Sequence, residues 1–226
     1  GGFDEQVVTI TINGTNDVPE ISAGSDLSAT ITELADGDPA ENTLDHVETG
    51  TLQVSGLDAT DTHTVTAAPQ GAGYLGTFTP GGLDPVTEEV IWTFTVNDAD
   101  LDTLPAGTVL TQDYEVTVED SLGASHTVTV TVTINGSNDR PDAQDDATLV
   151  VAGADAMLDV VANDSDVDGD PLTVISASVP AGEGTLVDNG DGTVTFTPVA
   201  GFTGTATISY TIADPEGLED TAVHIV

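Results

Sequence analysis

Carboxylate and amide side chains gather at two places in this sequence, each directly after a strand-like run of alternating apolar residues. The two copies occupy residues 8–20 and residues 130–142, and they align without a gap. In each copy Asn-Gly ends the alternation, and Asn-Asp-x-Pro then favours extended backbone, because the residue before proline avoids the helical region. We call residues 14–20 the first linker and residues 136–142 the second linker. A strand and an acidic linker that recur at the spacing of one domain predict a tandem array of modules.

A further acidic stretch places Asp164, Asp166 and Asp168 at alternate positions before Gly169. Carboxylates, amides and backbone carbonyls are the oxygen ligands that Ca²⁺ prefers. The spacing resembles the opening of an EF-hand loop, but Ile175 stands where that loop ends in glutamate and strands flank the stretch, so we reject an EF-hand. We still expect these residues to wrap one Ca²⁺. Mg²⁺ fits less well because it gives up water reluctantly, and Zn²⁺ prefers His or Cys.

The charge balance is extreme, with 40 acidic residues against 1 basic residue, Arg140, and a net charge of −39. Such self-repulsion opposes compaction. Disorder is disfavoured by well-alternating strands and 38% hydrophobic residues. A merely solvated acidic surface and bound cations therefore remain as the two explanations of the charge. Nucleic acid and anionic membranes are poor partners for such a surface, and no apolar run is long enough for membrane insertion.

The chain of 226 residues fits two domains of roughly 100–150 residues. We assign residues 1–17 to the last strand of a preceding module and its linker, residues 18–138 to one module and residues 139–226 to another. The end of the sequence stops inside a strand pattern, so we expect a piece of a longer array. Short Thr/Val/Ile runs between turn residues predict an all-β fold, a β-sandwich in each module. The predicted strands are residues 27–33, 51–55, 62–67, 75–79, 90–96, 111–118 and 125–134, then 148–151, 157–161, 172–178, 185–187, 193–197, 205–212 and 220–226.

The predicted strand order sorts the acidic loops of the second module. Because up-and-down strands alternate between two ends, loops 162–171, 188–192 and 213–217 share the end that carries the second linker. The loops of the opposite end carry only Asp155 and Glu183. A solvated acidic surface gives no reason for this sorting, whereas a cation site does.

In the first module, loops 35–41 and 97–102 are expected to face those acidic loops across the second linker. A long insertion-like loop, residues 34–49, precedes its second strand. Bare carboxylates on both sides would repel one another unless hard cations lay between them. The candidate calcium ligands are Asn16, Asp17, Glu20, Asp58, Asp61, Asp98, Asp100, Asp102, Glu119, Asp120, Asn138, Asp139, Asp142, Asp145, Asp164, Asp166, Asp168, Asp170, Asp214 and Glu216.

No catalytic motif stands out, and we expect no enzyme. Any pair among so many acids could be nominated for glycoside hydrolysis, so that signal has no value. The sequence contains no Gly-x-Ser-x-Gly and no phosphate-binding loop. Trp92 and Phe94 fall on one face of a strand, and Tyr114 and Tyr210 fall in strands, so all four are expected in cores rather than on a sugar-stacking platform.

Residues 131–139, together with Val116–Asp120, resemble the end of the VCBS-type repeat of giant bacterial repeats-in-toxin (RTX) adhesins. Residues 140–146, 161–172 and 193–204 resemble the cadherin-like, immunoglobulin-like tandem domains of the same adhesins. Both Asn-Asp-x-Pro linkers are similar to the calcium-binding linkers of cadherins. The Gly-Gly-x-Gly-x-Asp nonapeptide of toxin-type secretion repeats is missing from this sequence.

The resemblance implies tandem immunoglobulin/cadherin-like sandwiches that are secreted to the bacterial cell surface. It also implies calcium-stiffened rods that support adhesion and biofilm formation. The partners we expect are neighbouring modules of the same chain, in a monomer. An alternative function is a calcium-dependent carbohydrate-binding module for exopolysaccharide or a host glycan, so polysaccharide stays open as a partner.

Overall fold

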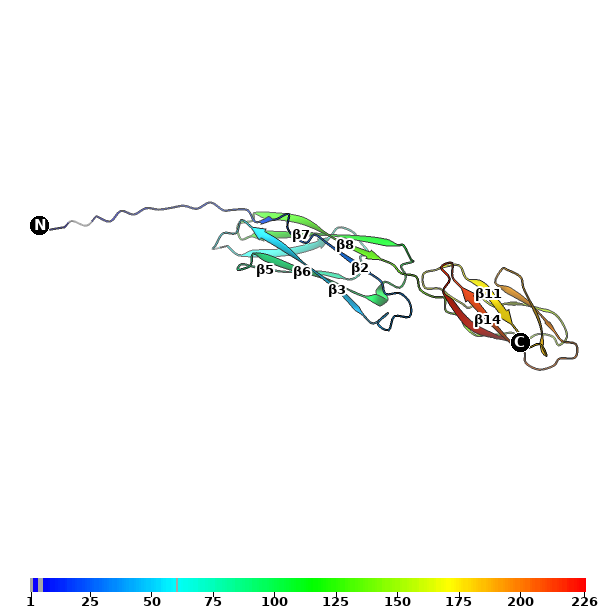
Figure 1. Ribbon diagram of the computed structural model, residues 1–226. Coiled ribbons are helices and arrows are strands. Elements are labelled where there is room, and N and C mark those ends of the chain that lie inside the picture. Colours follow the sequence, from blue (N-terminus) through cyan, green and yellow to red (C-terminus); the bar gives the residue numbers. More distant parts are fainter. Residues whose placement is uncertain (1, 4–5, 60) are drawn as a thin grey trace. The chain divides into compact units, whose positions relative to one another are not determined.

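The computed structural model describes residues 2–3, 6–59 and 61–226, and it confirms the predicted all-β fold. The one helical element among these residues is the short 3₁₀ helix η1 (Asp98–Asp100). No helix in this part of the chain has the length and apolar character needed to cross a membrane. The strands form two β-sandwiches, as Figure 1 shows.

The first sandwich packs two four-stranded sheets face to face (Figure 1). Its first sheet has the order β1 (Glu20–Ile21), β3 (Asp45–Ser55), β6 (Glu89–Asn97), β5 (Thr77–Asp84), and its second has the order β2 (Ser28–Thr32), β8 (Ser125–Asn135), β7 (Val109–Asp120), β4 (His63–Pro69).

Alternating side chains build the core of the first sandwich. Trp92 and Phe94 on β6 are fully buried, and Tyr114 on β7 is nearly so, as the alternation predicts. Phe78 stacks on Trp92 with ring centroids 5.4 Å apart and on Tyr114 with centroids 4.5 Å apart. Such aromatic pairs stabilise a core beyond the area they bury.

The second sandwich packs a three-stranded sheet on a four-stranded sheet around Phe196, Tyr210 and Ile212. The predicted core position of Tyr210 is confirmed, since its side chain is 1% exposed. The first sheet has the order β10 (Ala156–Asp159), β13 (Thr193–Pro198), β12 (Gly184–Asp188), and the second has the order β11 (Thr173–Ser178), β14 (Thr207–Ala213), β15 (Glu219–Ile225), β9 (Asp146–Ala147).

Strand pairing brings the acidic loops of the second sandwich to one end. Asp159 at the end of β10 pairs with Thr193 at the start of β13, so loops 160–172 and 189–192 share an end. Thr173 at the start of β11 pairs with Ala213 at the end of β14, which adds loop 214–218 to the same end. We call this the acidic end of the second sandwich.

The chain divides into two compact units, and the division crosses the long strands of the first sandwich. One unit contains Gly1–Ala29, Val47–Phe94 and Gln112–Val132. The other contains Thr30–His46, Thr95–Thr111 and Thr133–Val226. This second unit therefore holds loops 33–44 and 98–108 of the first sandwich, the second linker and the whole second sandwich.

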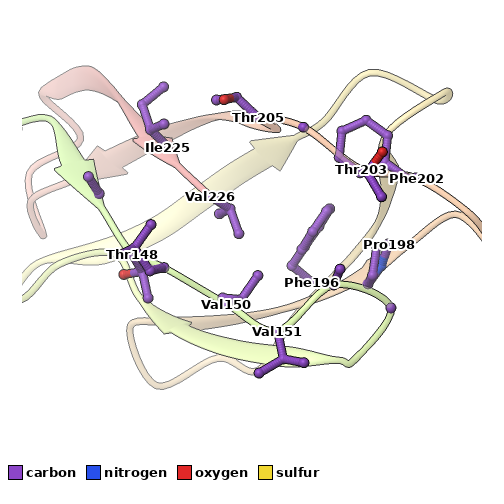
Figure 2. Close-up of a pocket in the computed structure, with 15 residues that line it drawn as sticks. Thr148, Val150, Val151, Phe196, Pro198, Phe202, Thr203, Thr205, Ile225 and Val226 are labelled. Atoms are coloured by element: carbon purple, nitrogen blue, oxygen red, sulfur yellow. The ribbon is translucent and has the colours of Figure 1, made fainter.

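Residues 148–151 were expected to form a strand, and that prediction is wrong. The amide of Thr148 still donates to the carbonyl of Ile225 at 2.8 Å, but Val226 pairs with Ala206, so the residues after Thr148 pair with no strand. Leu149 is fully exposed. An apolar cavity of about 290 Å³ lies beneath this segment, lined by Phe196 and other side chains that Figure 2 labels.

The predicted loop 34–49 is also too long, because β3 begins at Asp45. Gly50 lies inside this strand. A Cβ atom at Gly50 would collide with the ring of Trp92, so glycine here allows close packing rather than a turn. The two-residue strand β1 was missed, because the alternation it offers is too short to detect.

Gly136 is the position where we expect the largest backbone effect of a single methyl group. Its amide donates to Thr108 O at 3.0 Å, and an added Cβ would collide with the backbone oxygen of Leu104. Gly136→Ala is therefore expected to cost about 2–3 kcal/mol of unfolding free energy, measured by chemical denaturation. Gly14, its counterpart in the first linker, has no atom within 4 Å of such a Cβ. Gly14→Ala is the matched control, and equal losses in both variants would contradict this packing.

Candidate metal centre at the second linker

The second linker is held on one side by loops of the first sandwich. Strand β8 ends at Asn135, and the amide of Ser137 donates to Glu33 Oε2 at 2.8 Å. Glu33 directly follows β2 and lies on the same side of the strand as the buried Ile31. The carboxylate of Glu33 thereby fixes where the linker leaves the sheet. These residues all belong to the second compact unit.

The acidic end of the second sandwich holds the other side of the linker. Asn138 Nδ2 donates to Asp214 Oδ2 at 2.7 Å, and the amide of Asp139 donates to Asp168 Oδ2 at 2.9 Å. Asp214 is itself 5% exposed and accepts the amide of Leu218 at 2.8 Å. The Asn-Asp pair of the linker therefore docks on two aspartates from different loops of the second sandwich.

A cluster of three carboxylates forms where these contacts meet. Glu33, Asp102 and Asp139 each place an oxygen within 4.8 Å of the other two. Glu33 is 3% exposed and Asp139 is 6% exposed. Glu33 Oε1 and Asp139 Oδ2 are buried without any hydrogen-bond partner, an expensive arrangement for carboxylate oxygens.

The cluster fits a calcium ion. Oxygens that share one Ca²⁺ at about 2.3–2.6 Å lie at most about 5 Å apart, which is the spread found here. The donor set is all oxygen, which suits a hard cation and not zinc. The unpartnered oxygens of Glu33 and Asp139 are the observation that separates this cluster from an ordinary acidic surface, where water satisfies the carboxylates.

A second group of carboxylates adjoins the first through Asp168. Asp166, Asp168 and Asp170 place oxygens within 4.8 Å of one another. Asp166 Oδ1 accepts the amide of Asp168 at 3.0 Å, which shapes the loop. Asp166 Oδ2, Asp168 Oδ1 and Asn138 Oδ1 are buried without partners. Loop and linker therefore offer further free oxygens beside Asp139.

Burial and mutual repulsion disturb the ionisation of the first cluster. Burial raises the pKa of Glu33 to about 8. The hydrogen bond from Ser137 lowers this pKa, and the negative charges of Asp139 and Asp168 raise it further. Burial and the charges of Asp168 and Asp102 raise the pKa of Asp139 to about 7. Burial likewise raises the pKa of Asp102. Without a cation, the cluster therefore holds protons at neutral pH.

Arg140 does not supply the missing positive charge to the cluster. Its guanidinium Nε pairs with Asp36 Oδ2 in loop 33–44, and half of the side chain is exposed. Asp36 was not among the predicted ligands. The pair ties the second linker to the first sandwich at one point, while the carboxylates of Glu33 and Asp139 remain without a cationic side chain.

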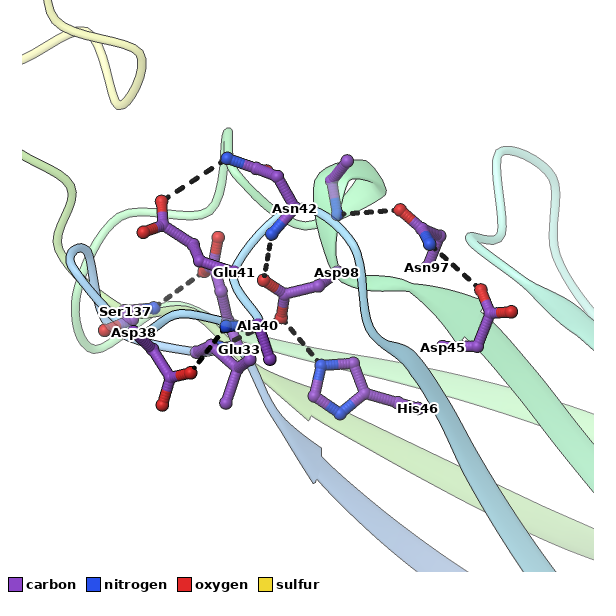
Figure 3. A network of polar contacts seen from close by, with 12 residues as sticks. Glu33, Asp38, Ala40, Glu41, Asn42, Asp45, His46, Asn97, Asp98 and Ser137 are labelled. Carbon is purple, nitrogen blue, oxygen red and sulfur yellow. Dashed lines mark hydrogen bonds and ion pairs between the residues drawn. The ribbon is translucent and has the colours of Figure 1, made fainter.

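Asp98 was predicted as a metal ligand, but its oxygens already have other partners (Figure 3). Asp98 Oδ1 accepts the amide of Leu34 at 3.0 Å and lies 2.7 Å from His46 Nε2, while Oδ2 accepts the amide of Asn42 at 3.0 Å. Burial raises the pKa of Asp98, but the hydrogen bonds from His46, Leu34 and Asn42 outweigh it and hold the pKa below its usual value. Asp98 thus anchors loop 33–44, which carries Asp36, close to the cluster.

Replacing Asp98 with alanine is expected to remove this anchor. The variant leaves the amides of Leu34 and Asn42 without an acceptor, which costs about 3 kcal/mol in total. Thermal unfolding at neutral pH measures the loss. Asp100→Ala is the matched control, because Asp100 lies in the same 3₁₀ helix with its side chain exposed. A similar melting temperature for both variants would contradict the anchoring role.

The first linker repeats the docking contacts of the second. Asn16 Nδ2 donates to Asp120 Oδ2 at 2.9 Å, and the amide of Asp17 donates to Asp58 Oδ2 at 2.8 Å. Asp61 Oδ2 is buried nearby without a partner. These residues lie in the first compact unit. Two further predicted ligands of this end, Glu20 and Glu119, have exposed side chains on β1 and β7.

The remaining predicted ligands of the second sandwich fall into a separate network or stay exposed. Asp164 Oδ1 accepts from the amide of Gln144 at 2.8 Å and from Tyr210 Oη at 3.2 Å, while its Oδ2 is buried without a partner. Asp142 accepts the side chain of Gln144 at 2.7 Å. The carboxylate of Asp145 accepts the amide of Val223, and the side chain of Glu216 is exposed.

Glu33 is the candidate ligand that the sequence reasoning missed. Glu33 is the last residue of the predicted strand 27–33. Candidate ligands were sought in the linkers and loops, so an acid within a strand was passed over. The alternation did contain a signal, because Ile31 and Glu33 are two residues apart and therefore share the inward face. An acid on the inward face of a strand is rarely left without a partner. That pattern could have nominated Glu33.

Residues 137–226 match the family model of the cadherin-like domain. The matched range starts in the second linker and runs through the second sandwich, so the cadherin-like domain includes Asn138, Asp139 and the aspartates that bind them. The likeness of the first sandwich to VCBS-type repeats and the RTX origin stay predictions.

Several solved structures are similar at low identity. The human desmocollin-1 ectodomain is 14% identical over 95% of this chain and 37% of its own, with a TM-score of 0.40. Protocadherin gamma B7 cadherin domains 1–4 are 10% identical over 93% of this chain and 50% of their own, with a TM-score of 0.42. The fimbrial subunit AggA of Escherichia coli is 12% identical over 55% of this chain and 99% of its own, with a TM-score of 0.34. No curated protein matches the chain.

Proposed function

We propose that this chain is a calcium-stiffened structural extender of a bacterial cell-surface adhesin, in which Ca²⁺ at the second linker fixes the cadherin-like domain against the first sandwich. The observation that carries the proposal is the pair of buried, unpartnered oxygens on Glu33 and Asp139. One comes from the first sandwich and the other from the linker, so an ion that both bind restrains the linker.

The mechanism follows from the charges. Glu33, Asp102 and Asp139 repel one another when ionised, which favours separation of the two sides. A Ca²⁺ ion bound to all three replaces that repulsion with attraction, and Asp168 and Asn138 offer further oxygens on the side of the cadherin-like domain. Extracellular modules bind Ca²⁺ with dissociation constants of roughly 10⁻⁴–10⁻³ M. One such site adds about 2.7 kcal/mol at about 100-fold excess over its dissociation constant.

The role in adhesion and biofilm formation is the finer part of the proposal. It is supported by the cadherin-like match of residues 137–226 and by the sequence resemblance to adhesin repeats. The proposed location is the bacterial cell surface. The neighbouring modules of the same chain are the proposed partners.

The carbohydrate-binding alternative has no comparable observation in its favour. Trp92 and Phe94, the residues best suited to stack on a sugar, are fully buried in the first sandwich. Phe3 is the one fully exposed aromatic side chain among the described residues.

Small-angle scattering with and without calcium tests the stiffening. In millimolar Ca²⁺ we expect one narrow distribution of interatomic distances, and in chelator we expect a broader distribution from a flexible linker. Glu33→Gln is expected to show the flexible profile in both conditions, and Asp155→Asn, at the opposite end of the cadherin-like domain, is expected to behave as the unmodified chain. Identical profiles with calcium and with chelator would overturn the proposal.

A further inference from the structure

Residues 6–13 form an apolar face that nothing in the described structure covers. They read Gln-Val-Val-Thr-Ile-Thr-Ile-Asn and contain no charged residue, in a chain whose net charge is −39. Val8, Ile10 and Ile12 are 80%, 79% and 89% exposed, and the segment pairs with no strand. An uncharged segment with high β propensity and no proline is an aggregation hazard when exposed, so a cover is expected.

The sequence of strand β8 indicates what kind of structure would bury residues 6–13. Residues 8–16 align without a gap with residues 130–138, and the two stretches differ only at Ile10, where β8 has Val132, and at Thr15, where the second linker has Ser137. In β8, which lies between β2 and β7, the matching apolar side chains Val130, Val132 and Ile134 face the core and are 0% exposed.

The linker after each stretch provides an independent observation. Asn16 and Asp17 dock on Asp120 and Asp58 with the same donor and acceptor atoms that Asn138 and Asp139 use on Asp214 and Asp168. The first linker therefore makes the same hydrogen bonds to the first sandwich that the second linker makes to the second sandwich. The segment before Asn16 stands where β8 stands before Asn138.

We propose that residues 6–13 are the last strand of a β-sandwich of the same build as the first sandwich, formed by residues that precede them in the same polypeptide. Val8, Ile10 and Ile12 enter its core, and Thr9 and Thr11 face outward. The segment pairs on both sides with strands equivalent to β2 and β7.

The second linker specifies two further features of this partner. An added Cβ at Gly136 would collide with the backbone of Leu104, so the partner passes its equivalent loop over Gly14. Glu33 accepts the amide of Ser137, so the partner presents a carboxylate to the amide of Thr15. The preceding sandwich must therefore offer two strand edges, one loop that passes close to Gly14 and one buried carboxylate. None of these features depends on calcium.

A lengthened chain tests the proposal. Residues 18–127, which are the first sandwich up to the third residue of β8, are placed directly before residues 6–226, so that residue 6 takes the place of residue 128. Amide hydrogen exchange in residues 6–13 is expected to slow at least 100-fold relative to the unmodified chain. Ile10→Asp is expected to abolish this protection and Thr11→Asp, its outward neighbour, to preserve it.

Several outcomes would overturn the proposal. One is unchanged exchange in a lengthened chain whose other sandwiches are folded, and another is equal protection in the two aspartate variants. Protection that already occurs in the unmodified chain and grows with protein concentration would assign the segment to a second copy instead.

A second measurement needs no added sandwich. The double substitution V132I/S137T gives β8 and its linker the sequence of residues 8–16. If residues 8–16 are built as a last strand, the melting temperature of the double variant should equal that of the unmodified chain. A large loss of stability would contradict the proposal, because this sequence would then fail in the position it is inferred to occupy.

Discussion

In chelator, the melting temperature of the chain is expected to fall as the pH rises from about 5 to about 8, and in millimolar calcium this fall is expected to disappear. The cause lies in Glu33, whose pKa rises from 4.5 to about 8, and in Asp139, whose pKa rises from 3.8 to about 7. Carboxylates with raised pKa values bind protons more tightly in the folded chain than in the unfolded chain. Their stabilising contribution is therefore complete below the unfolded values and is lost as the pH passes through the folded values.

The expected size is large. One pKa unit corresponds to about 1.4 kcal/mol, so a shift of about three units at either carboxyl group alone changes the stability on the order of 4 kcal/mol. In a domain of roughly 100 residues that is a shift on the order of 15 °C. Bound calcium replaces the protons and keeps the carboxylates ionised, so its stabilising effect should increase with pH. Differential scanning calorimetry over the pH series measures both conditions.

Two results would contradict this account. A flat profile in chelator would show that Glu33 and Asp139 are not buried together as described. Parallel profiles with calcium and with chelator would show that calcium does not bind to these carboxylates. Below the usual aspartate range the anchoring role of Asp98 predicts the opposite slope, because its lowered pKa gives stability that is lost as the pH falls.

Glu33→Gln and Asp139→Asn are expected to have opposite effects on the melting temperature in chelator and in calcium. Each substitution removes a negative charge from the cluster, and the side-chain oxygen of the glutamine introduced by Glu33→Gln can still accept the hydrogen bond from Ser137. In chelator at about pH 8 both variants should therefore melt at a higher temperature than the unmodified chain. In calcium the order should reverse, because the neutral amide is a weaker ligand than a carboxylate.

Calorimetric titration measures the second half of this prediction. We expect calcium affinity at the linker to fall at least about 10-fold in each variant, the size of effect expected when an ion ligand loses its charge. Asp155→Asn is the control, since it removes the same charge at an exposed position on the opposite end of the second sandwich. A calcium affinity unchanged in both cluster variants would show that the ion binds elsewhere.

The sequence was most informative where the two-residue alternation of a strand and the turn residues that flank it indicate the same strand. Alternation placed Trp92, Phe94 and Tyr210 in cores, and counting strands between turns brought the acidic loops of the second sandwich to one end. Both inferences use only the period of 2 of a strand and the reversal at each turn. The prediction of a strand at 148–151 was wrong although these residues alternate well. After Thr148 the segment has no neighbouring strand to pair with, and such pairing cannot be read from the local sequence.

The candidate site was predicted less completely than the fold. The sequence nominated Asp102, Asp139 and Asp168 from their loops, and the structure brings their carboxylates close together or into contact with the same linker. It could not distinguish them from Asp98, another loop aspartate, both of whose oxygens are hydrogen-bonded within the first sandwich. It missed Glu33, which faces inward from a strand. Which acids keep an unpartnered oxygen depends on tertiary packing and cannot be read from charge alone.

A crystal structure of the calcium-soaked chain, with anomalous data collected to locate the ion, is the sharpest test of the proposed calcium site. An anomalous peak is expected at about 2.3–2.6 Å from carboxylate oxygens of Glu33, Asp102 and Asp139. Further peaks beside Asp166, Asp168 and Asp170 would extend the same centre. Density for calcium only at exposed acids, with the oxygens of Glu33 and Asp139 still unpartnered, would contradict it.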